Sequence, residues 1–174
     1  GYTLRSPSAA NTQAHLAIGP GQTTVLTGTA LVEAPVVLTP IETWRQARFG
    51  TIANSGTAAD TSDPDGDGLA NLHEYLLGTD PLAPGDAAPL TVRAVGANLE
   101  LGFLARRATG PGYADLVRRH EIQTSDNLAD PASWVRVVGH GPITGADNLE
   151  SVTVPAPTGG ARFYRLRAWL EPAP

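Results

Sequence analysis

The sequence contains no cysteine, no methionine and no lysine. Without cysteine, a disulfide framework, a thiolate metal site and a cysteine nucleophile are all excluded. No run approaches 18 apolar residues, so the sequence predicts no membrane-spanning helix. Because the chain shows neither an initiating Met nor a signal peptide, we expect Gly1 to be a processed or excised end. All 12 basic residues are Arg, which indicates codon bias rather than a function.

Composition and charge favour a β-rich protein with acidic character. The chain has 174 residues, of which 41% are hydrophobic, and it carries 19 Gly and 15 Pro. This balance suits a core of strands joined by many turns better than a helical bundle. The net charge of −5 argues against a nucleic-acid partner, because proteins that bind nucleic acids need a basic face.

Residues 1–38 are predicted to be a β-strand segment. Residues 15–18 lead into the turn signal Gly19-Pro20-Gly21, residues 23–31 are rich in Thr, Val and Leu, and residues 35–38 fit a short further strand. This stretch is too short to close a sheet. We therefore expect the end of an upstream β-domain or strands exchanged with other copies by strand addition, with folding back on its own sandwich as the alternative.

Residues 39–82 are predicted to form a helix, a calcium loop and a second helix. Thr39, Pro40 and Glu42 make a capping box with proline at the first helical position, and Gly50 ends this helix after Phe49. Trp44 is its expected anchor in the core. The second helix spans about 71–77 and ends at Gly78.

Residues 89–174 are predicted to form an antiparallel β-sandwich of the fibronectin III or immunoglobulin type. Apolar residues alternate with polar ones there, and turn signals separate the segments. The predicted strands are 90–95, 99–104, 116–124, 134–138, 151–154 and 162–170, the first two joined by a hairpin at 96–98.

One motif carries chemistry, the twelve residues from Asp63 to Glu74. Calcium takes six to eight oxygen ligands at roughly 2.3–2.6 Å, and alternate acidic residues on a tight loop supply them. Gly68 permits the sharp bend, Leu69 offers its backbone carbonyl, and Glu74 closes the site with two oxygens. The predicted metal ligands are Asp63, Asp65, Asp67, Leu69, Asn71 and Glu74.

The nature of these ligands narrows the choice of ion. The nearest nitrogen ligand, His73, lies between liganding positions, which makes zinc a poor fit, and magnesium is a weaker candidate than calcium. Pro64 disfavours a helix running directly into the loop, and the chain has no second loop. A calmodulin-like paired sensor is therefore not expected.

The segment Asp63–Pro81, D-P-D-G-D-G-L-A-N-L-H-E-Y-L-L-G-T-D-P, resembles the thrombospondin type 3-like, EF-hand-like calcium repeat of secreted bacterial proteins. Residues 44–50 resemble the W-x-x-x-x-F-G helix that precedes such loops. Residues 122–128, Trp134 and 162–167 resemble the β-sandwich that closes many large bacterial surface proteins, and residues 27–33 resemble the last strand of a repeated upstream β-domain.

The resemblance implies export, a C-terminal position in a longer precursor, and a scaffold or adhesion role without a reaction. Family members often carry tandem loops, with the Asp of G-T-D-P serving the next ion. Because no second loop follows here, we expect Asp80 to cap a turn.

The remaining candidates are weaker. The four histidines show no metal spacing, and no G-x-S-x-G, HExxH or P-loop motif is present, so no catalytic residue is predicted. Trp44 and Trp134 are expected in the core, and Trp169 on the opposite strand face from Leu170. The pairs at 106–107 and 118–119 fit either solvated charges or a basic patch for acidic glycans.

The sequence thus predicts a non-catalytic, calcium-binding structural module of an extracellular matrix or bacterial cell surface, with calcium as the cofactor. Its expected partners are calcium and other copies of itself, with no nucleic acid. A carbohydrate-binding accessory module of a secreted enzyme and a C-terminal export or anchoring module remain as alternatives.

Overall fold

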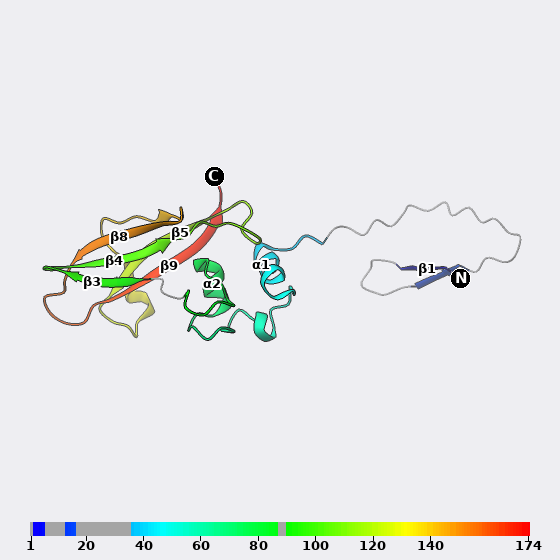
Figure 1. The fold of residues 1–174 in the computed structure, drawn as a ribbon, viewed down its shortest axis with the longest axis horizontal. Helices are drawn as coiled ribbons and strands as arrows, with labels where there is room; N and C mark the ends of the chain where they lie inside the picture. The colour runs from blue at the N-terminus through cyan, green and yellow to red at the C-terminus, as the bar shows by residue number, and fades with distance from the viewer. Residues whose placement is uncertain (1, 6–12, 17–35, 87–89) are drawn as a thin grey trace, which may run out of the picture. The chain divides into compact units, whose positions relative to one another are not determined.

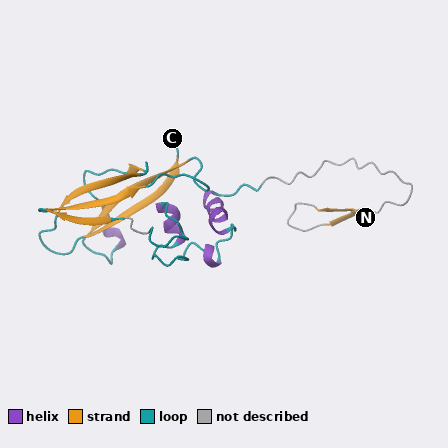
Figure 2. Cartoon of the chain, in the orientation of Figure 1, coloured by secondary structure: helices purple, strands orange, loops and turns teal. Residues whose placement is uncertain are grey.

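The computed structural model describes residues 2–5, 13–16, 36–86 and 90–174. The chain divides into two compact units, Gly1–Val37 and Leu38–Pro174. No described helix is long and apolar enough to cross a bilayer. Within the second unit, most of the strands lie toward one end and the two α-helices toward the other (Figure 1, Figure 2).

The first unit contains a short antiparallel pair. Strand β1 (Tyr2–Arg5) pairs with β2 (Gln13–Leu16), with Tyr2 opposite Leu16. Strand β2 overlaps the predicted strand at 15–18, whereas β1 was not predicted. The strand predicted at 23–31 lies outside the described residues, and residues 36–38 lie outside any strand.

Helix α1 (Pro40–Phe49) has the predicted capping box. The Thr39 amide donates to Glu42 Oε2 over 2.8 Å, and the Glu42 amide donates to Thr39 Oγ1 over 3.4 Å. At the other end Gly50 adopts the left-handed conformation, with φ 72°, and its amide donates to the Gln46 carbonyl. These contacts satisfy amide and carbonyl groups that a helix end leaves free, and both predicted boundaries are confirmed.

A short 3₁₀ turn, η1 (Gly56–Ala58), and the acidic loop connect α1 to helix α2 (Asn71–Leu77). Helix α2 ends at Gly78 in the left-handed conformation, with φ 80°, as the sequence predicted. Its partner in the sheets is β9, against which it packs (Figure 1).

The described strands of the second unit form two antiparallel sheets. The first has the order β3-β4-β8, from β3 (Thr91–Val95), β4 (Asn98–Ala105) and β8 (Asn148–Pro155). In the second, β5 (Leu116–Ser125) pairs along its length with β9 (Phe163–Pro172), and also with the short strands β6 (Val135–Arg136) and β7 (Ile143–Thr144). A 3₁₀ turn, η2 (Pro131–Ser133), precedes β6. The prediction of a mainly β protein is confirmed at this level.

Residues of both sheets contribute to one hydrophobic cluster. Leu101 and Phe103 of β4, Val152 of β8 and Ile122 of β5 are buried together, and Leu166 of β9 packs against them. A second cluster joins the helices to the sheets, with Trp44 of α1, Tyr75 of α2 and Tyr113 at its centre. Trp44 is thus a core residue, as predicted.

Trp134 differs from its prediction. It is half-buried, and the guanidinium of Arg165 lies 4.2 Å from the centre of its ring. Trp169 is also half-buried and has Arg167 over its ring at 5.0 Å. A tryptophan face covered by arginine stays partly wet because the charged group above it needs water, which is why Trp134 is not a core residue.

Candidate metal centre

Two glycines shape the acidic loop. Gly66 and Gly68 have φ of 76° and 96°, in the left-handed region that other residues rarely adopt. Their amides point back to Asp63: Gly66 donates to Oδ1 over 2.9 Å, and Gly68 donates to Oδ2 over 3.0 Å. The carboxylate of Asp63 therefore organises the turn.

Asp65 and Asp67 each use one carboxylate oxygen for the loop, and the other has no hydrogen-bond partner in the described part of the chain. Asp65 Oδ1 accepts from the Asp67 amide over 3.2 Å, and Asp67 Oδ1 accepts from the Leu69 amide over 2.9 Å. In both side chains Oδ2 is buried and has no hydrogen-bond donor among the described residues. The carboxylates of Asp63, Asp65 and Asp67 offer oxygens within 4.8 Å of one another, so this cluster could hold a metal ion.

Asn71 begins helix α2 and is fully buried. Its Nδ2 donates to the carbonyls of Thr57 and Ala59, over 2.8 Å and 2.7 Å, and its own amide donates to Ser62 over 2.8 Å. These bonds fix the orientation of the side-chain amide. Asn71 Oδ1 remains buried and without a donor in the part of the chain that the structure describes.

Glu74, one turn further along α2, is also fully buried. Thr79 Oγ1 donates to its Oε1 over 3.3 Å, whereas Oε2 is buried with no donor from the described residues. Burial, followed by the negative charges of Asp65 and Asp67 and more weakly of Asp63, raises the pKa of Glu74 to about 7. Glu74 therefore lies within electrostatic range of all three aspartates.

The arrangement suits a hard cation. Four buried oxygens, one each from Asp65, Asp67, Asn71 and Glu74, lack a donor among the described residues. A buried polar atom left unpaired costs about 1–3 kcal/mol, and more where it is charged. A cation held by Asp63, Asp65 and Asp67 would offset the mutual repulsion of these carboxylates. The structure does not bring Glu74 into this group of three, although its charge interacts with theirs.

Three further residues considered in the sequence analysis contribute no unpaired side-chain oxygen to the loop. Leu69 is half-buried and contributes its amide to the Asp67 turn. His73 is exposed. Asp80 accepts from the Leu82 amide over 3.2 Å and pairs with Arg48 over 2.9 Å, so it caps a turn as expected.

Two supports of the loop were not predicted. Buried Arg45 of α1 donates to Asp60 over 2.5 Å, and the Asp60 carbonyl accepts from the Leu72 amide over 3.1 Å. Thr79 holds Glu74 Oε1. Thr79 directly follows Gly78, which ends the helix, and this position was a sequence signal that its hydroxyl could reach the end of α2. Nothing in the sequence connects Arg45 to Asp60.

Tyr75, the α2 residue after Glu74, joins this helix to the segment between β4 and β5. The Tyr75 hydroxyl donates to the Gly112 carbonyl over 3.0 Å, and the Tyr113 hydroxyl donates to the Tyr75 carbonyl over 2.9 Å. The two rings stack with centres 5.0 Å apart. One turn of helix thus places a buried carboxylate in the loop and a buried aromatic ring in the core.

Comparison of the chain with protein-family models, with curated proteins and with solved structures found no match. The geometry of the chain itself must therefore support any assignment of function.

Proposed function

We propose that residues 63–74 bind one calcium ion per chain and that the protein is a calcium-stabilised, non-catalytic structural module. The observation that supports this most directly is the set of four buried oxygens without donors, from Asp65, Asp67, Asn71 and Glu74. They occupy the third, fifth, ninth and twelfth positions of the loop, four of the five positions at which an EF-hand-like loop presents side-chain oxygens; the fifth, position 1, is Asp63.

Calcium fits these ligands better than other common ions. Every side-chain ligand offers oxygen, which favours a hard cation over zinc. Magnesium demands near-ideal octahedral geometry and gives up its water reluctantly, whereas calcium accepts a larger and more flexible set of oxygens. The expected dissociation constant is on the order of 10⁻⁴ to 10⁻³ M, the range of extracellular modules.

The wider role rests on the resemblance together with the fold. We assign the two sheets to a fibronectin III- or immunoglobulin-like sandwich, which is supported by the cluster to which both contribute. The resemblance to secreted bacterial surface proteins supports a location at the cell surface or in the extracellular matrix, where millimolar calcium would keep a weak site loaded.

Isothermal titration with CaCl₂ tests the proposal, with MgCl₂ as the competing ion. We expect one calcium per chain and weaker binding of magnesium. Glu74→Gln removes a charged ligand, and losing one charge-assisted contact should weaken calcium binding about tenfold or more. Glu150→Gln, on strand β8, is the matched control and should bind like the parent protein.

The same variant separates a ligand from a residue needed for folding. Because the aspartates repel the Glu74 charge, Gln at this position should leave the calcium-free protein at least as stable as the parent. No calcium heat at millimolar concentration, or equal affinities for the parent and Glu74→Gln, would show that the loop is an acidic turn without an ion.

A further inference from the structure

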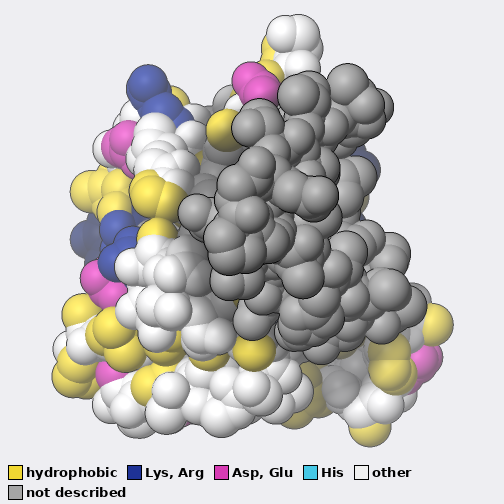
Figure 3. Space-filling view, turned by 90° about the vertical axis from the view of Figure 1, so that its right-hand side faces the viewer, with side chains coloured by type: hydrophobic (Ala, Val, Ile, Leu, Met, Phe, Trp, Pro, Cys, Tyr) yellow, Lys and Arg dark blue, Asp and Glu magenta, His cyan; other side chains and the backbone are white. Residues whose placement is uncertain are grey.

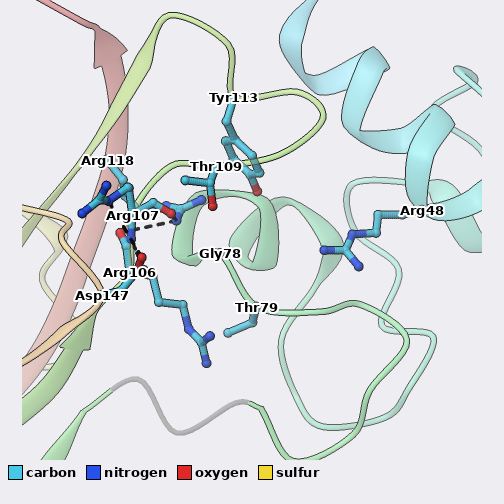
Figure 4. Close-up of a pocket in the computed structure, with 9 residues that line it drawn as sticks. All are labelled: Arg48, Gly78, Thr79, Arg106, Arg107, Thr109, Tyr113, Arg118 and Asp147. Carbon is cyan, nitrogen blue, oxygen red and sulfur yellow. Dashed lines mark hydrogen bonds and ion pairs between the residues drawn. The ribbon is translucent and has the colours of Figure 1, made fainter.

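A pocket of about 190 Å³ lies beside the C-terminal end of α2, within the second unit (Figure 4). Its arginines come from three parts of the chain: α1, the segment directly after β4, and β5. On the described part of the face in Figure 3, acidic, basic and hydrophobic side chains are interspersed. The arginines that line the pocket are Arg48, Arg106, Arg107 and Arg118.

Three of these arginines face a carboxylate. Arg48 lies 2.9 Å from the carboxylate of Asp80, and Arg107 lies 3.8 Å from that of Asp147. Arg106 makes a close contact with the carboxylate of Asp86. All six side chains are partly exposed, so water screens each pair. The pairs are Arg48–Asp80, Arg106–Asp86 and Arg107–Asp147.

The fourth arginine, Arg118, has no carboxylate partner among the described residues. It is only 2% exposed. Its guanidinium donates to the carbonyls of Arg107, over 2.7 Å, and Tyr75, over 3.2 Å, and its Nε has no acceptor in the described chain. Carbonyl groups are neutral, so these bonds orient the guanidinium without supplying an opposite charge. Its guanidinium carbon also lies 4.8 Å from the centre of the Tyr113 ring, a cation–π contact that offsets only part of the cost of burying the charge. Buried charges are usually paired with an opposite charge.

We infer that this pocket binds an oxyanion of the size of one sulfate or carboxylate group. Arginine presents its N–H groups in a planar fork that matches both groups. The cavity is several times the volume of about 30 Å³ that one water occupies in the liquid, so such a group fits together with a few waters. Thr109 lines the same space and adds a hydroxyl (Figure 4).

Asp147 competes with this ligand. Its Oδ1 accepts from the Arg107 amide over 2.7 Å, and its Oδ2 lies 3.8 Å from Arg107 Nε. The residue has φ of 62°, a left-handed conformation that asparagine also tolerates. Asp147→Asn therefore removes the competing charge at a position where the backbone accepts the replacement.

Titration of the full chain with sodium sulfate tests the inference, with ionic strength held by NaCl and calcium held constant. We expect saturable binding of one sulfate. Arg107→Gln removes a charged donor from a side chain that is 59% exposed, and should weaken binding about tenfold. Asp147→Asn should tighten binding. Arg93→Gln, on the exposed strand β3, is the matched control and should change nothing.

Two sugar ligands identify the source of the anion, with glucose as the neutral control. If glucose 6-sulfate or glucuronate binds tighter than inorganic sulfate, the pocket takes the acidic group of a glycan. If inorganic sulfate binds as tightly as both, it takes the free anion. No saturable binding of any of them, or equal affinities in Arg107→Gln, Asp147→Asn and the parent protein, overturns the inference, and the arginines then serve only to join the helices to the sheets.

Discussion

The acidic loop with its helices and the pair of sheets are stabilised by different kinds of contact. In the loop, most hydrogen bonds join residues close in sequence, such as Asp63 with Gly66 and Gly68. In the sheets, residues of β5 pair with residues of β9 that lie at least 38 positions later along the chain, as Ser125 does with Phe163. Buried side chains such as Leu101 pack in a hydrophobic cluster to which both sheets contribute. The loop gains little from apolar burial, so its folded form depends on satisfying its charged oxygens, whereas the sheets depend on the hydrophobic effect.

The largest expected effect tests the sheet side of this comparison. Leu101 is fully buried in β4, so Leu101→Ala should lower the free energy of unfolding by about 2–5 kcal/mol, through lost burial and the cavity left behind. Urea unfolding measures this loss. Calcium affinity of the folded variant should match that of the parent protein, and a large loss of affinity would show that the loop depends on the packing of the sheets.

Removal of calcium tests the loop side. A ligand that binds only the folded state stabilises it by about 2.7 kcal/mol at one hundred times its dissociation constant. Chelation should therefore lower the melting temperature and increase amide exchange across residues 56–78. The amides of β4 and β5 should keep their protection. If the amides of β4 and β5 lose as much protection as those of the loop, the loop and the sheets unfold as one unit, coupled by the contacts between Tyr75 and Tyr113.

The smallest expected effect concerns His120, which is buried in β5. Burial, and then the nearby Arg118, lowers the pKa of His120 to about 4, against 6.5 for a free side chain. Between these values the unfolded chain binds a proton that the folded chain does not, so stability falls as the pH drops from about 6.5 toward 4.

His120→Leu should reduce this fall, by less than about 1.4 kcal/mol for each pH unit, the limit for one proton. Urea unfolding at pH 6.5 and 5.5 measures it in both proteins. Equal pH dependence in the two would show that His120 does not titrate on unfolding. Glu74 should contribute in the opposite direction, because its pKa is raised to about 7 and the folded chain therefore keeps a proton that the unfolded chain loses.

Sequence alone predicted most of what is local. The capping box of Thr39 and Glu42, the helix ends at Gly50 and Gly78, and the hairpin turn at Gly96 each depend on residues within a few positions of one another. Such signals act through backbone conformation and nearby hydrogen bonds, which the order of residues shows directly.

The features that the sequence did not predict depend on contacts between residues far apart in the chain. Strand β7 is two residues long and exists because Ile143 and Thr144 pair with β5, and β6 is shorter than the segment predicted at 134–138. The sequence predicts Trp134 in the core, but in the structure this tryptophan is half-buried and the guanidinium of Arg165 from β9 covers its ring. The arginine pocket draws on residues from 48 to 147, so no window of sequence displays it.

For the ligand loop, the sequence predicted the residues and the structure adds their surroundings. Acidic spacing alone indicated Asp63, Asp65, Asp67 and Glu74. It could not show that Asn71 is held by Thr57 and Ala59, or that Thr79 contacts Glu74, because these contacts require the chain between them to fold.

Gly78 must both adopt a left-handed backbone conformation and leave room for the Arg118 side chain, so substitutions at this position are restricted twice. Its φ of 80° already disfavours a side chain, and a Cβ built there would lie 2.3 Å from Arg118 Nη1. Gly66 has a similar φ but no described atom within 4 Å of its Cβ position, so a replacement there meets backbone strain alone. Evolution and protein engineering can therefore replace Gly66 more readily than Gly78, unless Arg118 changes at the same time.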